Sequence, residues 1–167
     1  SKLVDAIENM TEDFSMFDAE DRLVAYNSRF LQSFKDVPKI LSPGIRLGEI
    51  MRFFASKGLY DSTKSDIDKV VKERLKKLKT PGTYETEFSD GSWWLIKTNR
   101  TSDGGLVLVR NNITELKNRE KALLESEARL ELAHGKLVDA IENMSEDFSM
   151  FDAEDKLIAF NSSYLDS

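Results

Sequence analysis

The spacing of apolar and polar positions divides the first part of the chain into helices and strands. Apolar residues at helical spacing predict an N-terminal helix and three later helices. Alternation of apolar and polar residues predicts five strands, and the Asp90-Gly91 and Asp103-Gly104 pairs predict tight turns between the last three. The predicted order is helix 2–10, strands 13–17 and 23–26, helices starting near residues 28, 47 and 67, and strands 84–88, 93–98 and 106–109. This order predicts an α+β fold in which one antiparallel sheet carries its helices on one face.

From residue 113 onward, apolar residues recur every seven positions, which is the pattern of a coiled coil. The d positions of this repeat are Leu116, Leu123, Leu130, Leu137 and Met144. The a positions are Ile113, Glu120, Glu127, His134 and Ile141, and three of these five are polar. Polar residues in a seam set register and partner number at a cost in stability, so we predict a marginally stable, dimeric helix. Gly135 within this helix is a predicted hinge.

The opening of the chain has a near copy at its other end. Residues 2–33 and 136–167 match at 25 of 32 positions, at an offset of 134. A long repeat marks a unit that is used twice, and because the second copy stops early, we expect the sequence to be part of a longer protein. The copied strands lack the partners that follow the first copy, and exposed strand edges seek pairing. We therefore predict that 136–167 pairs with a second molecule, for which domain swapping is one route, and the alternative is a frayed or loosely packed tail.

Composition limits the chemistry of the chain. The 167 residues include 24 basic and 30 acidic side chains, a net charge of −6, which argues against binding of nucleic acid. No apolar run is long enough to cross a membrane and no N-terminal signal pattern is present, so we expect a cytoplasmic protein. The absence of cysteine excludes disulfides, thiolate metal sites and thioether-linked chromophores. With one histidine, His134, and no phosphate-cradling glycine loop, we expect no metal site and no catalysis by this part.

Four segments, taken in order, resemble the PAS sensory domain family. They are Phe14–Asp21 continued by Arg22–Asn27, then Ser89–Trp93, Asp103–Val109 and Asn112–Glu115. The first resembles the opening hairpin of the family, and the second resembles its late hairpin. The last, Asn-Ile-Thr-Glu, is similar to the Asp-Ile-Thr-Glu signature at which the final strand becomes the exit helix. Asn112 keeps a capping oxygen at this place but lacks the charge of the aspartate.

The resemblance implies a five-stranded antiparallel sheet that cradles a pocket, with helices over one face, followed by a long coiled-coil helix. It implies a sensory module that detects a small ligand or partner and relays the signal through a dimeric helical linker to a histidine kinase or nucleotide cyclase. The expected domains are a PAS domain at 1–111, a signalling helix at 112–135 and the truncated start of a second PAS domain at 136–167. The alternative is a PAS module that binds no ligand and serves dimerisation.

The resemblance and the apolar pattern together suggest three sets of functional residues. Candidates for the ligand pocket are Met16, Phe30, Phe34, Phe53, Phe54, Trp93 and Trp94. The signal junction is predicted at Asn112, Ile113, Thr114 and Glu115, and the dimer seam at Leu116, Leu123, Leu130 and Leu137. Arg52, Lys97 and Arg110 are candidates for contact with an anionic ligand, although solvated surface charges are the default expectation for such residues.

The cofactor is not identified by the sequence. The string Asn27–Gln32 resembles the flavin-binding string of light-oxygen-voltage photoreceptors, but Ser28 stands where those receptors have a thiol, and serine without a base is a poor nucleophile. The string also directly follows the second strand, which is earlier in the domain than in those receptors. We therefore interpret it as the start of a helix, and the alternative of a non-covalently bound flavin stays open. The family's haem histidine would lie inside the domain, and residues 1–133 contain no histidine.

Overall fold

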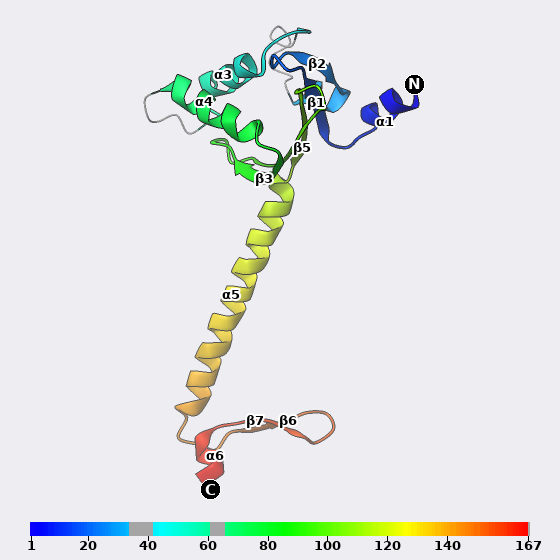
Figure 1. The fold of residues 1–167 in the computed structure, drawn as a ribbon. Helices are drawn as coiled ribbons and strands as arrows, with labels where there is room; N and C mark the ends of the chain where they lie inside the picture. Colours follow the sequence, from blue (N-terminus) through cyan, green and yellow to red (C-terminus); the bar gives the residue numbers. More distant parts are fainter. Residues whose placement is uncertain (34–41, 61–65, 167) are drawn as a thin grey trace. The chain divides into compact units, whose positions relative to one another are not determined.

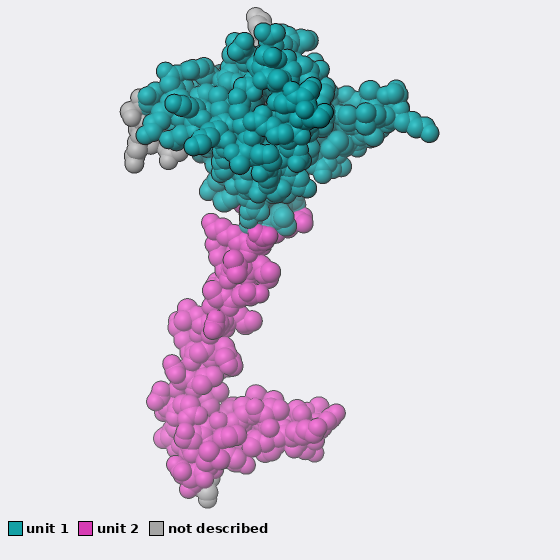
Figure 2. Space-filling view, viewed as in Figure 1, with its two compact units in different colours: residues 1–117 teal, residues 118–167 magenta. Residues whose placement is uncertain are grey.

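The computed structural model describes residues 1–33, 42–60 and 66–166, and the chain divides into two units (Figure 1; Figure 2). Unit 1 comprises Ser1–Lys117 and unit 2 comprises Asn118–Ser167. Phe34, one of the predicted pocket residues, lies outside the described residues. Within the described ranges, no helix is both long and apolar enough to span a membrane.

Unit 1 is built on one five-stranded antiparallel sheet, as predicted. Its strands are β1 (Asp13–Phe17), β2 (Leu23–Tyr26), β3 (Gly82–Glu87), β4 (Trp93–Arg100) and β5 (Leu106–Asn112). They lie in the order β2-β1-β5-β4-β3, so that β5 joins the opening hairpin to the closing strands. Phe17 of β1 is paired with Leu106 of β5, and a Cβ at the preceding Gly105 would collide with the Phe17 carbonyl oxygen. Only glycine therefore lets β5 begin this close to β1.

Three helices contribute to the core on one face of this sheet, and Figure 1 shows two of them, α3 and α4, side by side. They are α2 (Ser28–Gln32), α3 (Leu47–Ser56) and α4 (Ile67–Leu78). Each buries its apolar stripe, as helices that pack on a sheet do, and α3 and α4 also pack against each other. The resulting core includes Phe17, Leu23, Phe30, Leu47, Ile50, Met51, Val71, Leu78, Ile96, Leu106 and Leu108.

The N-terminal helix α1 (Lys2–Glu8) buries no residue. It is shorter than the predicted helix 2–10, because the Asn9 side chain donates a hydrogen bond to the Asp5 carbonyl oxygen at 2.7 Å and Asn9 ends the helix. Ser1 caps its other end by accepting a hydrogen bond from the Val4 N–H group.

The exit helix α5 (Thr114–Glu142) is continuous over 29 residues, which corresponds to about 43 Å. The predicted hinge at Gly135 is not seen, because this glycine lies inside the regular helix. The helix ends at Glu142, so Met144, the last predicted d position, lies beyond it. Ile113 precedes the helix and is buried in unit 1, 7% exposed, so it is not available as an a position of the seam.

Unit 2 repeats the opening hairpin of unit 1 after α5. Its elements are β6 (Ser149–Phe151), β7 (Leu157–Phe160) and α6 (Ser162–Asp166). The register of the hairpin and the irregularity in its first strand are those of β1 and β2. Asp21 and Asp155, at the same place in the two turns, both have positive φ angles, 64° and 60°. The copied sequence therefore adopts the same local structure without the three closing strands.

Candidate ligand cavity and signal junctions

A cavity of about 50 Å³ lies in unit 1, between the inner face of the sheet and helices α2, α3 and α4. Most of its wall is apolar and includes Phe30, Ile50, Met51, Phe54, Ile96 and Leu108. Alternation along β4 and β5 places Ile96 and Leu108 inside, because every second side chain of these strands faces the helices, and the other four residues come from α2 and α3. The cavity thus occupies the place where a small molecule would be held between sheet and helices.

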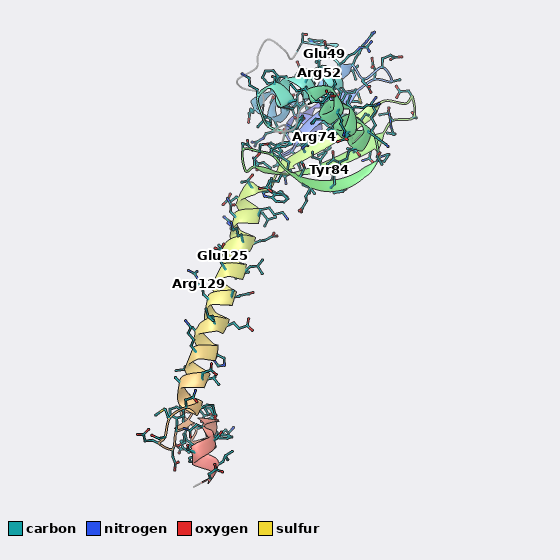
Figure 3. The ribbon with its side chains drawn as sticks, turned by 90° about the vertical axis from the view of Figure 1, so that its left-hand side faces the viewer. Glu49, Arg52, Arg74, Tyr84, Glu125 and Arg129 are labelled. Atoms are coloured by element: carbon teal, nitrogen blue, oxygen red, sulfur yellow. The ribbon has the colours of Figure 1, made fainter. Side chains whose placement is uncertain are left out.

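One side of the cavity is polar and aromatic. Arg74 and Lys77 lie one turn apart on α4, and both line the cavity. The Arg74 guanidinium lies 4.0 Å from the ring centre of Tyr60, and the Lys77 ammonium lies 4.3 Å from that of Tyr84. Figure 3 labels Arg74 on α4 and Tyr84 on β3. Each cation therefore faces a tyrosine ring, an attractive arrangement because the face of the ring is electron-rich.

Burial raises the pKa of both tyrosines above the ordinary value of 10.0. Desolvation raises the pKa of Tyr60 to about 12, against a weaker opposing effect of the positive charge on Arg74. Desolvation also raises the pKa of Tyr84 to about 12. Both phenols therefore retain their protons and remain able to donate hydrogen bonds.

A nearly buried ion pair includes one of the residues that line the cavity. Arg110 of β5 lines the cavity, and its Nη2 donates to Asp13 Oδ2 of β1 at 2.7 Å. Both side chains are nearly buried, at 11% and 10% exposure. The Ser33 hydroxyl donates to the same carboxylate oxygen, and the Arg110 guanidinium lies 4.7 Å from the ring centre of Trp94. The pair thus joins β1, β5 and the end of α2.

Asn27 joins the N-terminal helix to the domain. Its side-chain oxygen accepts hydrogen bonds from the N–H groups of Phe14 and Phe30, both at 3.0 Å. Its NH₂ group donates to the carbonyl oxygens of Ile7 and Glu12, at 3.1 and 2.9 Å. Asn27 is fully buried. One side chain therefore connects the end of α1, the start of β1 and the start of α2, and α2 carries Phe30 into the cavity wall.

The exit helix is fastened to the sheet at its first turn. The Ile113 N–H donates to the Trp93 carbonyl oxygen at 2.8 Å, and the Trp93 N–H donates to the Thr114 hydroxyl at 2.9 Å. The same hydroxyl donates to Asn112 Oδ1 at 2.6 Å, and that oxygen also accepts the Thr114 N–H. The Lys117 ammonium lies 5.2 Å from the ring centre of Trp93. Asn112 itself ends β5, so it is not the residue directly before the helix.

A family model described as PAS fold matches residues 7–121 of this chain. The chain belongs to the PAS family. The non-motile and phage-resistance protein of Caulobacter vibrioides (strain ATCC 19089 / CIP 103742 / CB 15) is 34% identical over 146 residues, which are 87% of this chain and 16% of that protein. This PAS chain therefore spans about one sixth of the curated relative that it matches.

The solved structures that resemble this chain include a PAS domain and a light-oxygen-voltage receptor. The PAS domain of an HTR-like protein from Haloarcula marismortui is 14% identical, with a TM-score of 0.41, and covers 67% of this chain and 89% of that one. An RNA-binding light-oxygen-voltage receptor is 14% identical, with a TM-score of 0.43, and covers 76% of this chain and 36% of that one.

The structure of this PAS domain brings only part of the predicted pocket set together. Phe30 and Phe54 line the cavity. Met16 lies on the opposite face of β1 from Ser15 and Phe17, because side chains alternate along a strand.

The other three predicted aromatics with described positions do not line the cavity. Phe53 lines a shallow groove beside Arg52 instead of the cavity. Trp94 packs on the core beside Arg110, and Trp93 lies beneath Lys117, so the two tryptophans use opposite faces of the sheet. Neither tryptophan is among the residues that line the cavity within the described ranges.

Most of the polar side of the cavity is not predicted by the sequence pattern. Tyr60 follows Gly58 in an irregular segment, where no periodic pattern indicates burial. Arg74 and Lys77 belong to a lysine-rich helix whose charges suggest a solvated face. Their spacing of three residues does place them on one side of the helix, which is the signal that could have linked them. Of the predicted cationic candidates, Arg110 lines the cavity, whereas Arg52 is paired with Asp68 outside it.

Proposed function

We propose that this PAS domain senses the state of its cavity and relays it through α5. The observation that carries the proposal is the course of β5. Leu108 and Arg110 line the cavity, and the same strand ends at Asn112, with only Ile113 between it and the exit helix. A shift of the cavity wall on β5 would therefore reach the helix start through one short piece of regular backbone.

The contacts of the first turn support such a relay. Ile113 and Thr114 are hydrogen-bonded to Trp93 of β4, and Ile113 is buried. The helix start is thus tied to two adjacent strands, β4 and β5, which pair over their whole shared length. Because packed elements change between discrete arrangements, a ligand that favours one arrangement of these strands would also favour one orientation of the helix start.

The signal would pass to a second copy of the chain along the leucine seam. Leu116, Leu123, Leu130 and Leu137 are between 53% and 72% exposed in the single chain. Apolar residues that repeat every seven positions on a solvent-facing helix are stabilised when two such helices pair. We propose a parallel homodimer through this seam, with an output such as a histidine kinase or nucleotide cyclase elsewhere in the longer protein.

A ligand-free dimerisation module is the second candidate function. The size of the cavity favours it, because about 50 Å³ is small beside typical ligand pockets of several hundred Å³. In that case the seam would pair in the same way, but the cavity would have no influence on it.

Cross-linking between two copies of α5 distinguishes the two candidates. The chain contains no cysteine, so Leu123→Cys introduces the only thiol. Disulfide formation between two copies in a glutathione buffer then reports how closely the two seams approach. Leu132→Cys, on the opposite side of the helix and 61% exposed, is the matched control and should cross-link much less.

The effect of the cavity on this cross-link is measured with a second substitution. Leu108→Phe adds bulk to the cavity wall, whereas Leu31→Phe makes the same change at an exposed position of α2. Sensing predicts that Leu108→Phe changes the cross-linking equilibrium at position 123 by about fivefold or more and that Leu31→Phe leaves it unchanged. Equal equilibria for the two variants, with both folded, would support the ligand-free module and overturn the relay.

A further inference from the structure

We propose that the cavity binds a short organic monoanion, a carboxylate with a small apolar body, and that Arg74 holds its charged head. This inference rests on the proposed sensory function and adds the chemical class of the ligand. It follows from the charge, the hydrogen-bonding groups and the size of the cavity.

The charge of the lining is entirely positive. Arg74, Lys77 and Arg110 contribute to the wall, and no aspartate or glutamate does so within the described part of the chain. Arg110 already has a buried carboxylate partner in Asp13. Arg74 and Lys77 differ from it, because no carboxylate among the described residues lies within ion-pair distance of either cation. An anion in the cavity would supply the missing counter-charge.

Arg74 is held in a position that leaves its donors available. Its guanidinium lies over the ring of Tyr60, at 4.0 Å, and within 5.6 Å of the ring centre of Phe88. A contact through the face of the guanidinium does not consume its N–H groups, which point outward in the plane and match the two oxygens of a carboxylate. The aromatic rings therefore fix the cation, and the ligand would take the hydrogen bonds.

The Tyr60 hydroxyl is a second donor for the same ligand. Tyr60 is buried, 4% exposed, and its hydroxyl forms no hydrogen bond with the residues that the structure describes. Tyr60 is one of the residues that line the cavity. A neutral phenol beside an arginine is suited to a carboxylate oxygen, which accepts from both.

The size of the cavity limits the apolar part of the ligand. A volume of about 50 Å³ holds roughly four water-sized groups. The apolar part of the lining includes Ile50, Met51, Phe54 and Leu108. A carboxylate with a body of one to three carbon atoms fits this space, whereas a long chain or a fused ring does not.

The test is a titration of the full chain with acetate, propionate, butyrate and hexanoate, each paired with its neutral primary amide. Binding is followed by ¹H–¹⁵N spectra, in which the Nε–H of Arg74 reports on the site, at constant ionic strength maintained with sodium chloride. We expect saturable binding of at least one of the three short carboxylates, weaker binding of hexanoate, and about tenfold weaker binding of the matched amide.

Substitutions locate the site. Arg74→Gln should weaken binding of the preferred carboxylate about tenfold, and Arg52→Gln, on α3 outside the cavity, should leave it within about twofold. Lys77→Gln provides a second cavity variant if Arg74→Gln does not fold.

Three results would overturn the anion assignment: no saturation by any carboxylate, equal affinity for carboxylate and amide, or equal losses for the Arg74 and Arg52 variants. Cross-linking at position 123 is measured without added carboxylate, so the two proposals are tested separately. The anion assignment can fail while the relay holds, and the relay can fail while the cavity binds a carboxylate.

Discussion

Asn27 and Asn161 lie 134 positions apart and form the same set of four hydrogen bonds. In each case the amide oxygen accepts from the first strand of a hairpin and from the helix that follows it. The NH₂ group donates to carbonyl oxygens of the preceding helix and of the loop before the strand. Both side chains are fully buried. The connection between helix and hairpin is therefore part of the repeated unit.

Replacement of Asn27 by alanine should destabilise unit 1 strongly. Asn27→Ala removes four hydrogen bonds of a fully buried side chain, and we expect the free energy of unfolding to fall by about 3 kcal/mol. Urea unfolding followed by tryptophan fluorescence measures this, because both tryptophans lie in unit 1. Asn161→Ala, in unit 2, is the control, and an equal loss for both variants would contradict the assignment.

Loss of the buried ion pair should cost far more than loss of an exposed one. Asp13→Asn leaves the nearly buried Arg110 without its counter-charge, and we expect a loss of about 3 kcal/mol in the free energy of unfolding. Asp68→Asn removes the partner of Arg52 in an exposed pair and should cost about 0.5 kcal/mol or less. The comparison is made by chemical denaturation, and similar costs would show that the buried pair is not stabilising.

The two tyrosines should make stability fall at high pH. Their pKa of about 12 in the folded chain exceeds the ordinary value of 10.0, so the folded chain retains protons that the unfolded chain loses. The contribution of the two tyrosines to the free energy of unfolding is fully present below pH 10 and is lost as the pH rises toward 12. Titration of tyrosinate absorbance and unfolding at several pH values measure it. Tyr60→Phe should flatten the pH dependence between these values, and an unchanged slope would exclude Tyr60 as a source.

The second hairpin should promote association between chains. Phe151 is 51% exposed, whereas its counterpart Phe17 is 1% exposed beneath the closing strands. Phe151→Asp should therefore weaken self-association about tenfold, as measured by light scattering over a range of concentrations. Leu165→Asp, on α6 and 68% exposed, makes the same change in polarity outside the strands. If both variants associate like the parent chain, the hairpin is not an interface.

The local pattern predicts most of the fold because the relevant signals are short-range. Alternation and the Asp-Gly turns locate the strands, and the five-stranded sheet and the covering helices are confirmed. The ends of helices are less well predicted. Met10 and Met144 fit the apolar spacing, but asparagine side chains at positions 9 and 143 bond to the preceding turn and end both helices earlier.

The site was less predictable, because it depends on contacts between distant segments. Asn27 has the sequence signal of a helix cap, and it is one, but its bonds to Ile7 and Glu12 require the folded arrangement of α1. The local sequence does not indicate that Arg74 lines a cavity. An amphipathic helix has two borders between its apolar and polar sides, and the sequence does not show which border faces a cavity. Tyr60 becomes buried only when α3, α4 and the sheet are assembled.

The seven-residue segment Lys-Leu-Val-Asp-Ala-Ile-Glu forms all of α1 and also the last turns of α5. Each copy is followed by an asparagine, Asn27 or Asn161, whose side chain is hydrogen-bonded to the helix and connects it to the hairpin. Duplication of such a block within a gene would therefore copy the connection between helix and hairpin together with the domain, and no new connection would have to evolve. Chains with different numbers of sensors could arise by gain or loss of whole blocks.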